Sequence, residues 1–209
     1  MKNILSLFAI PVYTNKISFD QKDLDYLKNV DYKMTEGLNG YQSVDTNILY
    51  EVNLLGLKAI IDSEVKEYIQ NTLGVAKHIE FKMISSWSML HNKGHWAQDH
   101  VHSNSLISGI LYLQTDKDSG DIVFKKTANY PNLFPSAVSP DIDTYNIFNS
   151  ESWTYKPENG LIIIFPSSLV HGVGVSNSDQ NRYCVAFNYF ICGQVSKRSG
   201  DCYLNIDLI

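Results

Sequence analysis

The spacing of apolar residues changes near residue 78, from a helical period to a strand-like one. Before that point apolar side chains recur every three or four positions, as on one face of an α-helix. Leu24, Leu27 and Val30 predict a short helix, and Asp20 is placed to act as its N-cap. The stretch Glu51–Thr72 predicts a second, longer helix. We expect both helices to cover the main body of the fold.

From residue 78 onward, apolar and polar residues alternate, which is the pattern of a half-buried β-strand. Turn-forming residues separate this first strand from the later ones. The apolar segment 4–12 is interpreted as a strand rather than a signal peptide, because it contains Pro11, is followed by Tyr13 and shows no small-residue cleavage site. Further strands are expected at 106–114, 121–125, 161–165, 170–175 and 182–192.

This order of elements, helices first and short strands afterwards, predicts an α+β fold that is mainly β, with a β-sandwich or jelly-roll body. Nothing in the sequence reads as a repeat or a linker, so one domain is expected over residues 1–209. Its parts would be an N-terminal strand with supporting helices (1–75), a β core (76–192) and a C-terminal tail (193–209). The polar segment 127–152 is expected to be a long loop, a feature that is usually functional.

The amino-acid composition argues against several classes of function. The 209 residues are 44% hydrophobic and 12% aromatic, as in an ordinary globular protein. The net charge of −5 argues against nucleic acid as a partner. No apolar run approaches the roughly 20 residues that span a bilayer, so no membrane partner is expected. The three cysteines form no CxxC pair, which predicts free thiols and a cytoplasmic location.

Two histidines stand just ahead of the strand at 106–114. Side chains at i and i+2 of a strand point the same way, so His100 and His102 should converge as half of a metal site. His171 opens a later strand and could complete that site. Arg182 begins an otherwise apolar strand, where burial is costly unless its guanidinium meets an anion such as a carboxylate.

An ordered set of residues resembles the Fe(II)- and 2-oxoglutarate-dependent oxygenases, and within them a small bacterial and phage subgroup. The resemblance covers roughly residues 80–192. The set comprises Trp87, Gly94, His100-x-His102-x-Asn104-Ser105, Ser108-Gly109, Tyr112-Leu113, Gly160, Phe165-Pro166-Ser167, His171, Arg182 and Phe187-Asn188.

The resemblance implies a double-stranded β-helix, which is a cupin-like form of the jelly roll. It also implies a dioxygenase that uses Fe(II), 2-oxoglutarate and O₂. Such an enzyme couples oxidative decarboxylation of 2-oxoglutarate to succinate with C–H oxidation of a substrate. We therefore expect a hydroxylase whose substrate, a small molecule or a protein side chain, is unidentified.

By the same resemblance, His100 and His171 are iron ligands and Arg182 binds the C5 carboxylate of 2-oxoglutarate. The wider family has Asp or Glu two residues after its first histidine, whereas this chain has His102. His102 is the expected third ligand, because i and i+2 geometry serves histidine as well as aspartate. Asp99 would need a bulge to take part, and a ligand from elsewhere in the chain is the remaining option.

Further candidates surround these residues. The wider family often has Ser two residues after its arginine, where this chain has a cysteine. His91 and His95 flank a turn and are expected at the surface, or at most on the substrate side. The cosubstrate candidates besides Arg182 are Tyr112, Cys184 and Asn188, and the substrate-side candidates are His95, Trp87 and Asn104.

Two other functions compete with the oxygenase. One is a non-enzymatic jelly-roll module that binds carbohydrate or a receptor and carries incidental or zinc-binding histidines. The other is a cupin-like metalloenzyme without a cosubstrate, which would want a Glu several residues after the histidine pair; none occurs between His102 and Gln114. The oligomeric state is left open, with a homodimer as one option.

Overall fold

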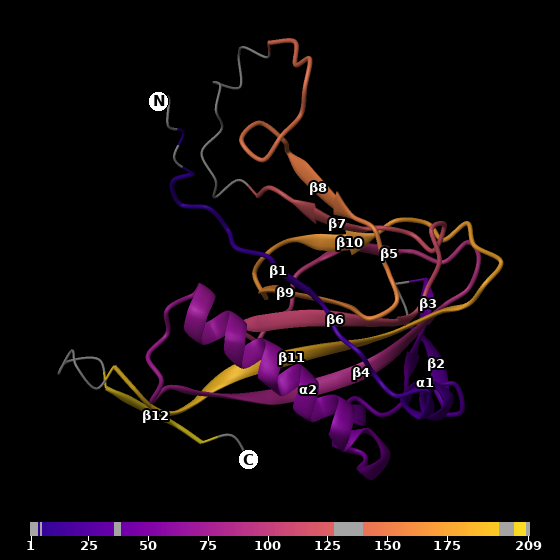
Figure 1. Cartoon of the computed structure of the whole chain (residues 1–209), viewed down its shortest axis with the longest axis horizontal. Coiled ribbons are helices and arrows are strands. Elements are labelled where there is room, and N and C mark those ends of the chain that lie inside the picture. Colours follow the sequence, from indigo (N-terminus) through magenta and orange to yellow (C-terminus); the bar gives the residue numbers. More distant parts are fainter. Residues whose placement is uncertain (1–3, 5, 36–38, 128–139, 197–202, 208–209) are drawn as a thin grey trace.

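The main architectural feature is a large antiparallel sheet that carries helices on one face and a smaller sheet on the other (Figure 1). The computed structural model describes residues 4, 6–35, 39–127, 140–196 and 203–207. In these residues the large sheet has the order β1-β9-β6-β11-β4-β3-β2, with β12 paired to β11. Its strands are β1 Tyr13–Lys16, β2 Tyr32–Thr35, β3 Gly40–Ser43, β4 Glu80–His91, β6 Ile107–Gln114, β9 Leu161–Pro166, β11 Arg182–Val195 and β12 Leu204–Ile206.

The smaller sheet has the order β5-β10-β7-β8 in the described part of the chain. Its strands are short, with three or four residues each. This two-sheet arrangement confirms the predicted, mainly β double-stranded β-helix. The strands are β5 Ala97–His100, β7 Ile122–Lys125, β8 Ser152–Tyr155 and β10 His171–Val173.

Both predicted helices form. Helix α1 (Gln21–Leu27) begins at a capping box in which the Asp20 carboxylate accepts the Lys22 N–H. The second helical stretch starts with 3₁₀ turns at 48–50 and 52–54, continues as α2 (Leu55–Glu67) and ends in a π-helical turn over Tyr68–Thr72. α2 lies across the large sheet (Figure 1), and its buried face is Leu57, Ile61 and Val65. The helical prediction is confirmed.

Strand β11 separates two hydrophobic cores. Alternate residues Tyr183, Val185 and Phe187 pack on the helix side of the large sheet. Cys184 packs in a second core between the sheets, together with residues of β6, β7 and β9. Because side chains alternate along a strand, Arg182 and Asn188 lie on the same inner face as Cys184. This inner face is where the candidate chemistry collects.

A bulge interrupts the alternation predicted for β4. Asn188 of β11 lies opposite Ser85, but the next residue, Tyr189, lies opposite Met83. Ile84 is therefore an extra residue in β4. Met83, before the bulge, consequently packs in the core on the helix side. Trp87 and Met89, after the bulge, face the core between the sheets.

The N-terminal strand is displaced from the position predicted at 4–12. Residues 7–8 form a turn, 9–12 are not in a strand, and β1 begins at Tyr13, where the chain pairs with Leu161–Ile164. Pro11 has no N–H to donate to a ladder, which is one reason the strand starts after it. In the predicted loop 127–152, residues 128–139 lie outside the described residues, and β8 begins at its end.

Cys184 and Cys192 are free thiols, while Cys202 lies outside the described residues. Within the described ranges, none of the helices has the length and apolar character needed to cross a bilayer.

Candidate metal centre

Three histidines meet between the two sheets. His171 of β10 pairs directly with His100 of β5, and His102 follows two residues later, where its N–H donates to the Ser167 carbonyl at 3.0 Å. One ring nitrogen from each of the three histidines lies within 4.8 Å of the other two. The Nε2 atoms of His100 and His102 are 3.3 Å apart. The convergence expected from the sequence is therefore present in the structure.

Hydrogen bonds orient all three imidazoles in the same sense. Each Nδ1 lies against an oxygen that can only accept, so Nδ1 carries the proton and Nε2 keeps its lone pair for the shared centre. For two of the rings that oxygen is the backbone carbonyl two residues earlier. The three pairs are His100 Nδ1 with Gln98 O at 2.8 Å, His171 Nδ1 with Leu169 O at 2.9 Å, and His102 Nδ1 with Asn188 Oδ1 at 2.6 Å.

The surroundings of two of these rings favour the neutral form. Burial lowers the pKa of His171 to about 3 and also lowers the pKa of His102. Two aromatic side chains lie against these histidines. The ring centroids are 4.7 Å apart for Phe165 and His171, and 5.6 Å apart for Trp87 and His102. Three neutral imidazoles with their lone pairs directed at one point are a donor set suited to a divalent transition metal such as iron.

Asp99 is turned away from this centre although β5 does bulge. His171 pairs with His100 and Val173 with Ala97, so the two residues between them on β5 share the single residue Gly172 as partner. Asp99 ion-pairs with Lys125 Nζ at 2.5 Å on the outer side. A Cβ on Gly172 would come within 2.8 Å of the Asp99 carboxylate, so glycine permits this close approach.

Arg182 is the first residue of β11, and its side chain is buried, at 1% exposed. Its Nη1 donates to the carbonyls of Ser119 and Gly120, each at 3.2 Å, and its Nη2 lies 2.7 Å from His91 Nδ1. Arg182 Nε has no partner among the described residues. The guanidinium is therefore held firmly and keeps a donor for a ligand.

His91 does not lie at the surface, and that prediction was wrong. It is 1% exposed, because β4 extends to this residue between β3 and β11 and places it directly opposite Arg182. Burial, with the Arg182 charge as a second cause, lowers the pKa of His91 to about 2. The neutral ring can therefore accept a hydrogen bond from Arg182.

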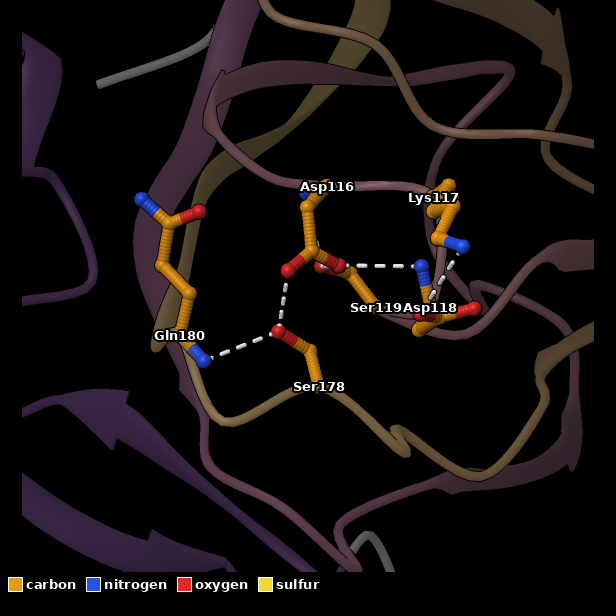
Figure 2. A network of polar contacts seen from close by, with 6 residues as sticks. All are labelled: Asp116, Lys117, Asp118, Ser119, Ser178 and Gln180. Carbon is orange, nitrogen blue, oxygen red and sulfur yellow. Dashed lines mark hydrogen bonds and ion pairs between the residues drawn. The ribbon is translucent and has the colours of Figure 1, made fainter.

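A polar network holds the turn whose carbonyls bind Arg182 (Figure 2). The Asp116 carboxylate accepts from the Asp118 N–H at 2.9 Å, from the Ser119 hydroxyl at 3.0 Å and from the Ser178 hydroxyl at 2.5 Å. Ser178 Oγ in turn accepts the Gln180 N–H at 2.9 Å. The sequence predicts a turn at 116–120 from its Asp-x-x-Ser-Gly pattern, but sequence reasoning missed the role of this turn in binding Arg182.

Tyr112 adds a second polar group without a partner near Arg182. Its ring centroid is 5.9 Å from Arg182 Cζ, and its hydroxyl has no hydrogen bond in the described part of the chain. Burial raises the pKa of Tyr112, so the hydroxyl keeps its proton. Cys184, opposite Tyr112 in the sheet register, is fully buried and its thiol pKa is raised for the same reason. Arg182 Nε and the Tyr112 hydroxyl thus offer two buried donors to an anion.

The remaining candidates lie in different places. Trp87 is beside His102, as noted above. His95 instead has its ring 6.1 Å from His91, and its Nδ1 accepts the Asn92 N–H at 3.2 Å, so it belongs to the Arg182 end of the sheet. Asn104 is exposed in the turn after His102, with φ of +60°. Asn188 contacts His102, which sequence reasoning had not foreseen.

Comparisons with known proteins agree with this arrangement. A family model described as "Putative 2OG-Fe(II) oxygenase" matches residues 85–188, which include every candidate residue named above. No curated protein matches the sequence significantly.

Solved structures share the fold at low sequence identity. An oxidoreductase of the 2OG-Fe(II) oxygenase family from Burkholderia pseudomallei is 14% identical, with 80% of this chain and 75% of that chain covered and a TM-score of 0.54. HygX from Streptomyces hygroscopicus, solved with nickel, 2-oxoglutarate and hygromycin B bound, is 10% identical, with 86% and 82% covered and a TM-score of 0.59. A prolyl hydroxylase from Trichoplax adhaerens, in complex with a peptide fragment, is 13% identical, with 81% and 75% covered and a TM-score of 0.55.

Proposed function

Because the chain belongs to the superfamily of 2OG-Fe(II) oxygenases, we propose that it is a hydroxylase that binds Fe(II) through His100, His102 and His171. The enzymes of this superfamily are oxidoreductases that require Fe(II), 2-oxoglutarate and O₂. The observation that carries the proposal is the convergence of three imidazoles, whose ring nitrogens lie within 4.8 Å of one another. Their Nε2 lone pairs are the donors that Fe(II) would take.

Arg182 is the proposed anchor for the C5 carboxylate of 2-oxoglutarate. Its Nε–H and the Tyr112 hydroxyl are both buried and both without a partner among the described residues. Leaving such donors unpaired costs free energy, so a ligand that accepts from them would bind favourably. Cys184 lies beside them and contributes shape rather than a hydrogen bond, because its thiol is a weak donor.

Iron bound at this centre would supply the oxidising chemistry, with its remaining positions open to the cosubstrate and O₂. The chain's own residues bind and orient. Imidazole binds a metal in its neutral form and cancels none of the metal's charge, so a dianionic cosubstrate would be attracted more strongly than by a site containing a carboxylate. Aromatic side chains, Trp87 beside His102 and Phe165 beside His171, limit the access of water.

The proposed substrate is a small molecule or a protein side chain. Proteins of similar fold have been solved with hygromycin B and with a peptide fragment, so the fold accommodates both classes. Trp87 is the proposed substrate-side residue nearest the centre, and Asn104 lies on the exposed turn that follows His102. His95 is less suited to this role, because its ring packs near His91.

Anaerobic titration of the protein with Fe(II) and then 2-oxoglutarate tests the proposal. We expect a weak visible metal-to-ligand charge-transfer band, and succinate formation once O₂ is admitted. Arg182→Ala should abolish the band at cosubstrate concentrations that saturate the wild type, while Fe(II) binding persists. Absence of both the band and succinate would overturn the proposal in favour of a non-enzymatic binding module.

A further inference from the structure

The three histidines differ in what holds their Nδ1 atoms. His100 and His171 each donate to the backbone carbonyl two residues earlier in their own strand segment. No substitution of a side chain removes a backbone carbonyl, so these two contacts are intrinsic to the local fold. His102 Nδ1 instead contacts two side chains, Asn188 Oδ1 of β11 at 2.6 Å, 86 positions away in sequence, and Ser108 Oγ of β6 at 3.0 Å. The orientation of His102 therefore depends on side chains, and Asn188 makes the shorter of the two contacts.

The Asn188 amide is itself fixed in a buried polar cluster. Its Oδ1 lies 2.6 Å from His102 Nδ1 and accepts from the Ser108 hydroxyl at 2.7 Å. Its Nδ2 donates to the Ser85 hydroxyl at 3.1 Å, and Ser108 is linked to Ser167 at 2.7 Å. Asn188 is 8% exposed, and Ser108 and Ser167 are almost fully buried. The cluster thus presents the carbonyl end of the amide to His102.

We propose that Asn188 is the positioning residue that makes His102 a metal ligand. A carboxylate offers lone pairs on both oxygens, whereas a neutral imidazole has one lone pair, whose position depends on the tautomer. A histidine at position 102 therefore needs a partner that keeps the proton on Nδ1. Asn188 Oδ1 is that partner, and Nε2 is left free to bind the metal.

This inference rests on the proposed function only for the identity of the bound ion. Loss of an outer hydrogen-bond partner of a ligating histidine typically weakens metal affinity by roughly 10- to 100-fold. Asn188→Leu keeps the approximate size of the side chain but removes the acceptor, so we expect that loss. Asn188→Asp restores an acceptor at the same place and should bring affinity back to within a few-fold of wild type.

The experiment measures Co(II) affinity, by chelator competition under anaerobic conditions, and the His102 tautomer, by long-range ¹H–¹⁵N NMR of the metal-free protein. Ser88→Ala is the matched control, because Ser88 is a buried serine of the neighbouring strand that bonds Tyr32 on the helix side. It removes a buried hydrogen bond from the same sheet and should leave both readouts unchanged.

We expect the His102 proton on Nδ1 in the wild type and in Asn188→Asp, and a mixture of tautomers in Asn188→Leu. A folded Asn188→Leu variant with wild-type Co(II) affinity and an unchanged tautomer would overturn the inference. If that variant does not fold, a wild-type His102 carrying its proton on Nε2 would overturn it equally. Failure of the wild type to bind Co(II) would instead refute the proposed function, while the tautomer measurement would still report on Asn188.

Discussion

His100 and His171 lie directly opposite each other on the antiparallel strands β5 and β10, with ring centroids 4.4 Å apart. The candidate metal centre is therefore built on strand register rather than on a loop. A shift of one residue in that register would turn one of the two rings to the other face of the sheet. The short ladder between β5 and β10 thus fixes two ligands, and the turn after β5 brings in His102.

Replacing either of these opposed residues should remove the metal. His171→Ala deletes one of three donors, so we expect Co(II) affinity to fall by more than the roughly 100-fold that loss of an outer partner causes. His78→Ala is the matched control, since His78 is exposed ahead of β4. Chelator competition measures both variants. Equal affinities in His171→Ala and wild type would show that the ion binds elsewhere.

Tyr112→Phe should affect cosubstrate binding and stability in opposite directions. The hydroxyl is buried without a partner among the described residues, and such a group costs about 1–3 kcal/mol. Its removal should raise the free energy of unfolding by about 1 kcal/mol, yet weaken 2-oxoglutarate affinity by about 2- to 10-fold through one lost hydrogen bond. Calorimetry on the Co(II)-loaded protein measures the affinity, and urea denaturation measures the stability.

Tyr32→Phe is the control for that experiment. The Tyr32 hydroxyl donates to the Leu27 carbonyl and contacts Ser88 on the helix side. Its loss should reduce stability without changing cosubstrate affinity. If Tyr112→Phe behaved like Tyr32→Phe, the Tyr112 hydroxyl would have no role at the anion site.

Asp116→Ala should weaken cosubstrate binding without affecting the metal. The pKa of the Asp116 carboxyl lies below its usual range, chiefly because of the hydrogen bond from Ser178. The carboxylate is therefore ionised at neutral pH and can order the turn that binds Arg182. We expect the dissociation constant of 2-oxoglutarate to rise about five-fold or more, the equivalent of one or more lost hydrogen bonds. Asp179→Ala, at an exposed ion pair with Lys93, should leave it unchanged. A loss of Co(II) affinity in Asp116→Ala would contradict this separation of the two sites.

The features that sequence reasoning captured are those set by local spacing. His100 and His102 could be paired because side chains repeat every two residues in a strand, and the capped helix after Asp20 follows from neighbouring residues. The long strands β6 and β11 could also be predicted, because each contains a long run of mostly apolar residues. The overall architecture followed from the order of these elements together with the family resemblance.

The features it missed depend on contacts between distant segments. Nothing local indicates that His91 lies opposite Arg182, or that Asn188 reaches His102, because sheet register decides both. The bulge at Ile84 reversed the phase of one predicted strand for the same reason. The four-residue strands β5 (AQDH) and β8 (SWTY) were missed because they lack the apolar run that marks the equally short β7 (IVFK).

His91 should make the protein sensitive to acid. Its pKa is about 2 in the folded protein against an ordinary value of 6.5, chiefly because the ring is buried. Above pH 6.5 the ring is neutral in both states and stability is unaffected. As the pH falls below 6.5 the unfolded chain takes up a proton that the folded chain cannot, so stability is progressively lost down to about pH 2.

The slope of this loss is at most about 1.4 kcal/mol per pH unit, and nearby titrating groups will add their own. His91→Gln keeps an acceptor for Arg182 but cannot be protonated, so the difference in unfolding free energy between wild type and variant should shift in favour of the variant as the pH is lowered from 7 to 4. Urea denaturation at each pH measures that difference, and His78→Gln, at an exposed position ahead of β4, is the control for the same substitution. If the wild-type and His91→Gln curves stayed parallel over this range, His91 would have to be protonated in the fold, and its hydrogen bond from Arg182 could not exist as described.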